Sequence, residues 1–492
     1  MAPRLSSINY QRIIVIMLRY SSVLRHYWEK QGEFSFMITR KRTPNATSTS
    51  GVKRSDTRFR WVLAALALSF VLWRSLGATS ALFGEVGQAS ATQGPQPTIV
   101  LPTTNPQATP HVLTAAEYAN LYVRQMSLND KVGQMIMIKL LGQTLNSDEQ
   151  IDIAQYHVGG VIAFGDALYS VGPVKQLVHD MQAASPTIPL WVGTDEEGGV
   201  VTRLTKVIVG SRPGEQDIGN SGDPAQAKAA GVQSAADFKS LGFNFNFAPV
   251  LDINEPGIFN TQLNGREYSS DPQTIAAFAN AYLQGFQSDG TLVAGIKHFP
   301  GLGGSPFDPH TALPIINKTQ AELEGHELIP YRSLLTLGNV KAVMVTHEYL
   351  PKIDNEYPAS LSAKITTGIL RDKMGFDGVI VTDSLDMEAL SRVYPVDQSA
   401  LLAAEAGADV LMMPYYPTTD VKPSIDAIIN AVQSGKITME HIDASVRRIL
   451  TLKIEMGLIK LPQAVLPASS PTATTTPPIL TPSVTTTPTK KP

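Results

Sequence analysis

Eight short apolar runs constrain the fold of this 492-residue chain more than any other feature. Each run is nearly continuous in apolar or β-branched residues, whereas a strand with one face in water alternates apolar with polar residues. Continuous runs are typical of strands covered on both faces, as in parallel sheets flanked by helices. The runs cover residues 135–140, 158–164, 190–193, 243–253, 291–296, 343–345, 379–381 and 410–413.

Helical patterns separate most of the runs, for example at residues 271–287 and 400–406. Helix-start signals precede the first run at residues 114–117 (TAAE) and 127–130 (SLND). Eight strands alternating with helices predict an α/β fold, a single (β/α)8 TIM-type barrel over residues 112–462. An open doubly wound sheet is the alternative, although no Gly-x-Gly-x-x-Gly sequence opens a helix after the first run.

Charged or imidazole side chains follow five of the eight runs. The carboxyl ends of barrel strands meet at one mouth, where barrel enzymes hold their active sites, so we expect these side chains to converge there. Aspartate is common at turns and helix caps, but turn chemistry alone does not account for five such positions. The residues are Asp195, Asp252, Lys297 with His298, His347 and Asp383.

The loop after the run at 291–296 carries residue types suited to acid/base chemistry. Residues 295–314 (GIKHFPGLGGSPFDPHTALP) are rich in glycine and proline, which predicts a surface loop able to move and then lock. Asp308 and His310 are separated by one proline in this loop. At that spacing the carboxylate can orient the imidazole, which prepares a histidine for proton transfer.

The amino-terminal part of the chain predicts export. Residues 1–57 are basic and without periodicity, so we expect a disordered tail. Residues 58–86 predict a signal peptide, or a membrane anchor through residues 61–83, because basic residues precede the apolar segment and small residues follow it. A Pro/Thr linker at 87–111 leads to the barrel, and a disordered Pro/Thr-rich tail at 463–492 follows it. We expect an exported protein, either membrane-anchored with an extracellular barrel or secreted.

Composition excludes several classes of function. The chain has no cysteine, so disulfides, thiolate nucleophiles and cysteine-based zinc or iron–sulfur sites are ruled out. The formal net charge of -3 provides no overall field that would attract nucleic acid. We expect a monomer with no cofactor, no bound metal and no nucleic-acid partner.

Five segments together resemble the family 3 glycoside hydrolases, and among them the bacterial β-N-acetylglucosaminidase (β-N-acetylhexosaminidase) branch. The presence of Lys-His-Phe-Pro-Gly and Asp-x-His in one loop is specific to that branch. The resemblance implies a retaining hydrolase on a single barrel that removes terminal β-linked N-acetylglucosamine from cell-wall or chitin-type glycans. The segments are residues 195–204 (DEEGGVVTRL), 247–252 (FAPVLD), 297–301 (KHFPG), 308–310 (DPH) and 375–383 (GFDGVIVTD).

The resemblance also implies roles for individual residues. Asp383 matches the family nucleophile, His310 the unusual general acid/base, and Asp308 the carboxylate that orients this histidine. Because Asp383 follows the run at 379–381, its carboxylate should point into the barrel mouth and attack the anomeric carbon there. The sugar-holding positions of the family are matched by Asp195, Arg203, Arg266, Lys297 and His298.

The chain departs from the family pattern at two places. Val200 stands where the family usually has the arginine of Gly-Gly-Arg, and Leu302 and Gly304 stand where it usually has the histidine and aspartate of Gly-His-Gly-Asp. Both departures remove polar side chains. They leave the catalytic trio intact but bear on substrate contacts and on the ordering of the loop.

Other interpretations fit the same residues. A histidine acid/base does not repel an incoming phosphate as a carboxylate would, so a β-N-acetylglucosaminide or β-glucoside phosphorylase of the same fold is an alternative. A non-catalytic surface glycan-binding protein is an alternative of another class, although it would not need Asp383, Asp308 and His310 together. For single residues, Asp383 could cap a helix beginning near Leu385, and Asp308 and His310 could bind a metal together with His298.

Overall fold

The structure, a computed structural model, describes residues 110–185, 187–208, 210–253, 255, 257–258, 260, 263–307, 312–413, 417–461 and 465–467. These ranges hold the expected barrel apart from short gaps. The segments predicted as a basic tail (1–57) and as a signal peptide or anchor (58–86) lie outside the described residues, as do Asp308 and His310.

Eight parallel strands form one sheet in the order β8-β7-β6-β5-β4-β3-β2-β9. A parallel bridge between Val381 and Val410 joins the two ends of this order, so the sheet curves into a nearly closed barrel. Every predicted run contributes one strand, and the alternative of an open doubly wound sheet is wrong. The strands are β2 (Ile136–Lys139), β3 (Gly160–Ile162), β4 (Trp191–Thr194), β5 (Phe245–Asn246), β6 (Val293–Phe299), β7 (Ala342–Val345), β8 (Val379–Thr382) and β9 (Leu411–Met412).

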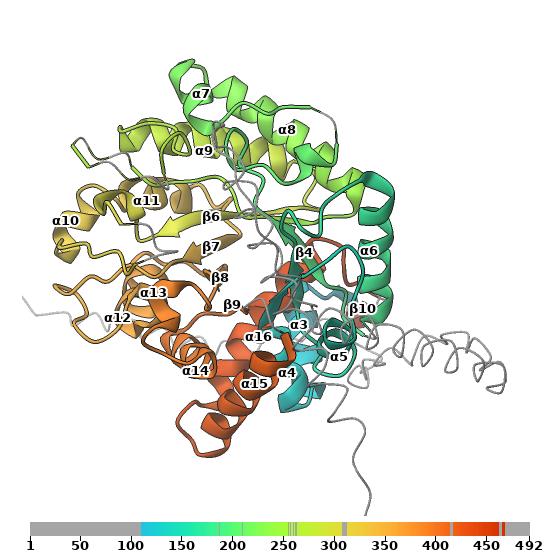
Figure 1. Cartoon of the computed structure of the whole chain (residues 1–492). Helices are drawn as coiled ribbons and strands as arrows, with labels where there is room; N and C mark the ends of the chain where they lie inside the picture. The colour runs from blue at the N-terminus through green and yellow to red at the C-terminus, as the bar shows by residue number, and fades with distance from the viewer. Residues whose placement is uncertain are drawn as a thin grey trace, which may run out of the picture. The chain divides into compact units, whose positions relative to one another are not determined.

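Helices lie around the strands, as Figure 1 shows. The longer helices are α3 (Ala115–Gln125), α4 (Leu128–Gln134), α5 (Ser147–Ala154), α6 (Val171–Ala184), α8 (Pro224–Leu241), α9 (Pro272–Phe286), α11 (Ile329–Thr336), α14 (Val396–Ala406), α15 (Pro417–Gln433) and α16 (Met439–Glu455). Short helices are α7 (Glu215–Asn220), α10 (Gln320–Glu324), α12 (Ala363–Ile365) and α13 (Glu388–Ser391), with 3-10 turns at Leu204–Lys206, Leu302–Gly304 and Ala359–Leu361 and a π-helix at Thr366–Lys373.

Local sequence signals set several helix starts. Thr114 and Glu117 form the predicted capping box of α3, and Ser127 caps α4 by accepting a hydrogen bond from the backbone N–H of Asp130. Asp271 caps α9, which has a proline at its first turn, where the missing N–H is not needed. The helix predicted at 271–287 is therefore confirmed to within one residue at each end.

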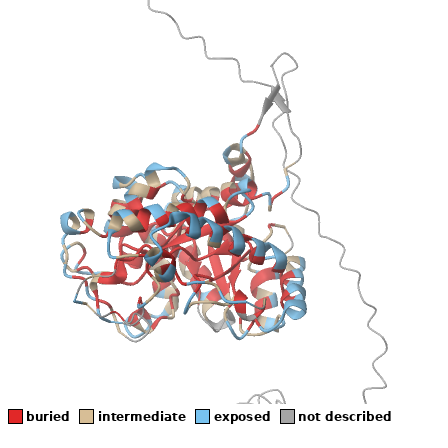
Figure 2. Cartoon of the chain, turned by 90° about the horizontal axis from the view of Figure 1, so that it is seen from above, coloured by how far each residue is buried: buried red, intermediate tan, exposed pale blue. Residues whose placement is uncertain are grey.

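Aromatic rings fill the barrel interior next to glycines. The rings of Phe245 and Phe247 lie 4.7 Å apart, centroid to centroid. A Cβ atom on Gly295 of β6 would come within 3.1 Å of the Phe245 ring, and one on Gly193 of β4 would meet Phe247 at 3.2 Å. Glycine on these strands thus leaves room for the rings, and Figure 2 shows buried residues concentrated on the strands and on the helix faces that cover them.

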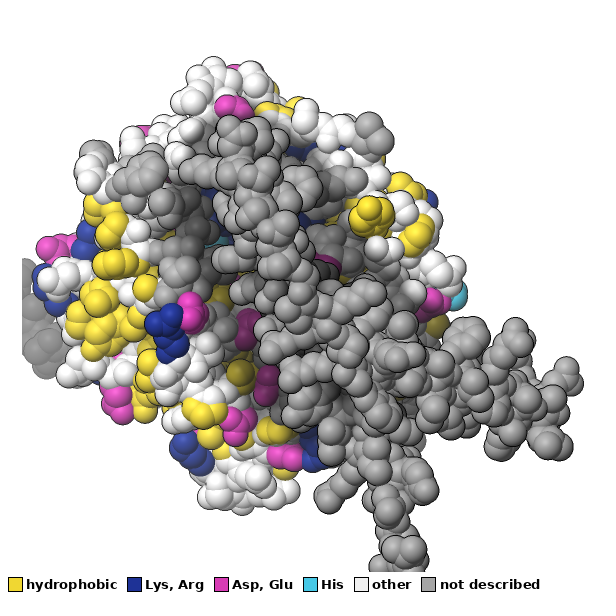
Figure 3. Space-filling model, viewed as in Figure 1, with side chains coloured by type: hydrophobic (Ala, Val, Ile, Leu, Met, Phe, Trp, Pro, Cys, Tyr) yellow, Lys and Arg dark blue, Asp and Glu magenta, His cyan; other side chains and the backbone are white. Residues whose placement is uncertain are grey.

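A two-stranded antiparallel pair joins the two ends of the described chain. Strand β1 (Pro110–Val112) pairs with β10 (Val465–Pro467), so this pair extends into the ranges predicted as linker (87–111) and tail (463–492). Among the described residues, no helix combines the length and apolar character needed to span a bilayer. On the face seen in Figure 3, the described acidic and basic side chains are interspersed with apolar ones.

Lys453 on α16 is fully buried at the amino-terminal end of the barrel. Its ammonium donates hydrogen bonds to the Gly159 carbonyl (2.7 Å) and the Gln134 side-chain oxygen (2.9 Å), and it lies 5.1 Å from the centre of the Trp191 ring. No ion pair with a carboxylate is found for it within the described ranges. Burial lowers the pKa of Lys453 to about 7.

We predict that Lys453 makes stability depend on pH above neutrality. Between pH 7 and the usual lysine pKa, the unfolded chain holds a proton that the folded chain lacks, so the free energy of unfolding rises with pH. The rise approaches about 1.4 kcal/mol per pH unit for one proton. Urea unfolding between pH 7 and 9.5 should show this slope in the wild type and its loss in Lys453→Met. Lys436→Met, at an exposed lysine, is the control and should keep the slope; parallel curves for wild type and Lys453→Met would contradict the prediction.

Candidate active site

A cavity of about 400 Å³ lies at the carboxyl-terminal ends of the strands. Its walls come from the ends of β2 and β3, the loops after β4 and β5, strand β6 and the segment after β8. All the predicted site residues that the structure describes line it: Asp195, Arg203, Arg266, Lys297, His298 and Asp383. The fold thus brings together side chains that are far apart in the sequence.

Asp383 follows β8 directly and presents an oriented carboxylate to the cavity. Thr346 donates its hydroxyl to Oδ2 (2.9 Å), and the Ser384 backbone N–H donates to Oδ1 (2.8 Å). Burial would raise the pKa of the Asp383 carboxyl, but His347, His298 and these hydrogen bonds outweigh burial and lower the pKa. Within the described residues no lysine or arginine pairs with it, so the ionised carboxylate is available to a substrate.

The alternative role of Asp383 as a helix cap is wrong. The first helix after β8 is α13, which begins at Glu388 with Met387 as its N-cap residue. Asp383 therefore lies too far before the helix to cap it.

Glu197 holds two cations of the cavity in place. Its carboxylate accepts two hydrogen bonds from the Arg266 guanidinium (2.7 and 2.8 Å) and pairs with the Lys297 ammonium (2.5 Å). Lys297 also donates to Asp195 (2.7 Å). Burial would raise the pKa of Glu197, but Arg266 and Lys297 outweigh it and hold the pKa well below the usual range. The four side chains form one compensated ion cluster, which presents fixed donors and acceptors.

His298 is fixed by Asp252. Its Nδ1 lies 2.5 Å from Asp252 Oδ2, and the other oxygen of that carboxylate accepts from the Leu302 backbone N–H at 2.6 Å. Asp252 thus ties the imidazole to the start of the loop after β6. With Nδ1 engaged, Nε2 of His298 is directed toward Arg266, 3.4 Å away.

Two cations flank the ring of Phe164 on another wall. Lys139 Nζ lies 4.6 Å from the ring centroid and Arg203 Cζ 5.8 Å from it. Burial lowers the pKa of Lys139, and the nearby carboxylates, Asp386 and Asp166 first, offset part of this shift. Arg203 was predicted as a site residue, whereas Lys139 was not singled out.

Three further acidic residues, Glu196, Glu267 and Glu348, lie near strand ends but outside the cavity. The Glu196 carboxylate accepts from the backbone N–H groups of Arg203 and Leu204, both at 2.6 Å, and Glu267 accepts from the Arg266 N–H. Glu348 is completely buried. None of the three lines the cavity.

His347, one of the six polar residues expected at the barrel mouth, is buried and hydrogen-bonded. Its Nε2 donates to the Ser384 carbonyl (2.9 Å), and Nδ1 lies 2.7 Å from the Ser360 hydroxyl. It supports the segment that carries Asp383 without lining the cavity.

The three residues that depart from the family pattern, Val200, Leu302 and Gly304, differ in exposure and in their contacts. Val200 is 71% exposed. Leu302 is buried in a small apolar cluster with Val250 and Leu263, so at this position the chain packs a hydrocarbon side chain. A Cβ atom on Gly304 would meet the side chains of Ile316 and Glu327 at 3.6 and 3.9 Å.

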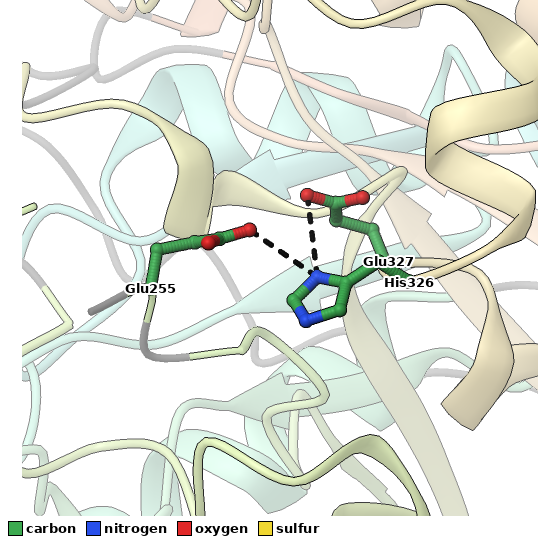
Figure 4. A group of neighbouring side chains, drawn as sticks. All are labelled: Glu255, His326 and Glu327. Carbon is green, nitrogen blue, oxygen red and sulfur yellow. Dashed lines mark ion pairs between the residues drawn. The ribbon is translucent and has the colours of Figure 1, made fainter.

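One group among the described residues has the spacing of metal ligands. Glu255, His326 and Glu327 each place one ligand atom within 4.8 Å of the others, and Figure 4 shows both carboxylates directed toward the imidazole. The Lys318 ammonium is paired with both carboxylates, however, and supplies the positive charge there. The group does not line the cavity.

A barrel mouth with one oriented carboxylate beside a compensated cluster of donors and acceptors defines an enzyme that acts on a polar, hydroxyl-rich substrate. The chain belongs to glycosyl hydrolase family 3: the family profile described as "Glycosyl hydrolase family 3 N terminal domain" matches residues 127–452. The resemblance noted from the sequence is thereby confirmed.

Named relatives support this assignment. Beta-hexosaminidase LpqI of Mycobacterium tuberculosis is 32% identical over 373 residues, which cover 74% of this chain and 91% of that protein; its solved structure has a TM-score of 0.62. A family 3 beta-N-acetylglucosaminidase from Paenibacillus sp. is 36% identical with a TM-score of 0.64, and the match covers 70% of this chain and 66% of that one. A beta-glucoside phosphorylase, BglX, covers 70% of this chain and 60% of that one, with a TM-score of 0.60 at 24% identity, which shows a shared fold alone.

We predict that Glu197→Gln destabilises the protein and impairs catalysis together. Removing one partner of a buried ion cluster leaves Arg266 and Lys297 with too little negative charge, and such changes cost about 3 kcal/mol or more. Urea unfolding measures the loss of stability, and kcat/KM should fall by about a hundredfold because the two cations lose their alignment.

The matched control is Glu455→Gln, which breaks the exposed Lys341–Glu455 pair (3.0 Å) and should change stability by no more than about 0.5 kcal/mol. A Glu197→Gln protein as stable and active as this control would show that the ion cluster has no role.

Proposed function

We propose that the protein removes terminal β-linked N-acetylglucosamine from cell-wall or chitin-type glycans by a retaining mechanism. The observation that carries the proposal is Asp383, an oriented carboxylate of lowered pKa in the cavity of a family 3 barrel. The choice of sugar is supported by the relatives named beta-hexosaminidase and beta-N-acetylglucosaminidase.

The ion cluster and its neighbours hold the sugar. Asp195 accepts hydrogen bonds from sugar hydroxyls, and Lys297 and Arg266 donate hydrogen bonds to sugar oxygens. His298 completes this sugar-holding wall, with Nε2 directed toward Arg266. Glu197 and Asp195 compensate the charges of Lys297 and Arg266. The N–H groups of Lys297 and Arg266 therefore act as fixed hydrogen-bond donors that attract anions only weakly. Arg203 supplies a further donor beside the Phe164 ring.

The reaction proceeds in two displacements. The Asp383 carboxylate attacks the anomeric carbon and forms a glycosyl-enzyme as the bond to the leaving oxygen breaks. His310 protonates that oxygen, and in the second step the same imidazole takes a proton from water as the water attacks the anomeric carbon. Asp308 orients His310 and favours its protonated form before the first step.

Product analysis tests this function against the alternatives. With an N-acetylglucosaminide as substrate, we expect free N-acetylglucosamine, of retained configuration when first formed, in the presence and absence of phosphate. A sugar 1-phosphate would establish the phosphorylase. Asp383→Asn should retain the fold and lose several orders of magnitude in kcat; binding of glycan without turnover by the wild type would establish a binding protein.

His310→Ala should separate the two steps. Substrates with poor leaving groups need the proton and should slow greatly, whereas activated aryl glycosides should still form the glycosyl-enzyme. Without the base, hydrolysis becomes slow, so stopped-flow assays should show a burst of aryl alcohol and then a slow steady state, which azide or formate accelerates. Equal slowing of all substrates, without rescue by these anions, would place the acid/base elsewhere.

We also propose that the barrel works outside the cytoplasmic membrane, secreted or anchored through residues 61–83. The support is the basic, apolar and small-residue pattern at residues 58–86. Protease added to intact cells should degrade or release the barrel, and full protection until lysis would reject export.

A further inference from the structure

Glu327 contacts both ends of the loop that joins β6 to α10. At the start of this loop, a Cβ atom on Gly301 would lie 2.9 Å from Glu327 Cγ, and Gly301 has a φ of 134°, a conformation that favours glycine. At the end of the loop, the Lys318 ammonium is ion-paired with the Glu327 carboxylate. The Glu327 side chain is only 2% exposed and the Lys318 side chain 28% exposed, so Glu327 makes both contacts from a buried position.

Lys318 also pairs with a third segment of the chain. Its ammonium lies 2.6 Å from Glu255 in the loop after β5, and Lys318 itself immediately precedes Thr319, the N-cap residue of α10. Burial would lower the pKa of Lys318, but Glu255 and Glu327 outweigh it and raise the pKa. One charged ammonium thus joins the loop after β5, the end of the β6–α10 loop and the link between α10 and α11.

Further contacts hold the two flanks of this loop. At the start, the Leu302 N–H donates to Asp252 (2.6 Å), which is also the partner of His298. At the end, the Tyr349 N–H donates to the Pro314 carbonyl and the Ile316 N–H to the Tyr349 carbonyl, at 2.8 and 2.9 Å. Glu327 connects one flank to the other through Gly301 and Lys318, next to the close approach of Gly304 to Ile316, and Lys318 supplies half of the connection made by Glu327.

We propose that Lys318 is a positioning residue for the acid/base step: through Glu327 it fixes the distance between the two ends of the loop whose sequence includes Asp308 and His310. The inference rests on the proposed function, in which His310 transfers the proton. Proton transfer needs its donor within hydrogen-bond reach of the leaving oxygen, so a change in the span of the loop acts on this step first. The sugar-holding residues Asp195, Lys297 and Arg266 are outside this cluster and should be unaffected.

The cluster is better explained by an ammonium at its centre than by a metal ion. Glu255, His326 and Glu327 have ligand spacing (Figure 4), but Lys318 already lies between the two carboxylates and compensates them. A divalent ion would have to displace this ammonium. Lys318 thus compensates the charge of the buried Glu327 carboxylate through Oε1, whereas Oε2 has no hydrogen-bond partner among the described residues.

The test compares Lys318→Met with Lys318→Arg and with a matched control. We expect Lys318→Met to lower kcat/KM by about ten- to hundredfold for glycosides with poor leaving groups and far less for activated aryl glycosides, with little change in KM. Azide should restore part of the slow deglycosylation. Lys318→Arg retains a cation for both carboxylates and should recover most of the activity, and Lys341→Met, at the exposed pair with Glu455, should behave as the wild type.

Circular dichroism and thermal unfolding accompany the kinetics. If Lys318→Met does not fold, Glu255→Gln provides the measurement, because it keeps the pair with Glu327 and should show a smaller effect of the same leaving-group dependence. Equal slowing of every substrate, or wild-type kinetics in a folded variant, would overturn the inference. So would a wild-type activity that requires Zn²⁺ or Mn²⁺ and is lost in His326→Ala.

The outcome for Lys318 is separable from that of the proposed function. If Asp383→Asn is inactive and Lys318→Met is normal, only the positioning role is rejected. If Asp383→Asn remains active, the proposed function itself fails.

Discussion

The buried carboxylate of Glu197 is the charge on which the polar wall of this barrel mouth depends. Lys297 and Arg266 come from β6 and from the loop after β5, and both are nearly buried. Two cations so close together repel each other, and a protein interior gives little screening. Glu197 and Asp195 offset this repulsion and fix the geometry of both cations, so their N–H groups can act as hydrogen-bond donors. Asp383 in turn forms no ion pair with a lysine or arginine among the described residues, which suits a nucleophile.

The barrel places these groups by its topology. Parallel strands end at the same edge, so residues that follow β4, β6 and β8 meet around one cavity although the chain between them is long. The hydrogen bonds that orient Asp383 come from Thr346 after β7 and from the backbone N–H of Ser384. His347 in turn donates a hydrogen bond to the Ser384 carbonyl. Polar residues that follow neighbouring strands are thus hydrogen-bonded to one another, and these bonds restrict the orientation of each side chain.

The strands were predictable because burial on both faces demands nearly continuous apolar runs, and all eight runs proved to be strands. The limits of the strands were less predictable. The run at 243–253 yields only Phe245–Asn246 as a strand, followed by a single bridge between Val250 and Lys297, because Pro249 has no N–H to donate. Asp195, Lys297 and Asp383 were identified because they follow strands and match family motifs. Glu197 and Lys139 were missed, since their partners come from other strands and only the fold reveals such pairs; the position of Glu197 beside Asp195 in one motif was the available signal.

The proposed glycosyl-enzyme on Asp383 can be detected directly by peptide mass spectrometry. His310→Ala protein is mixed with an activated aryl N-acetylglucosaminide, quenched in acid during the slow steady state and digested. We expect the peptide containing Asp383 to carry the mass of one N-acetylglucosaminyl group, and the corresponding peptide of the double variant with Asp383→Asn to carry none. A sugar adduct on a different residue, or turnover of substrate without any adduct, would contradict the assignment of Asp383 as the nucleophile.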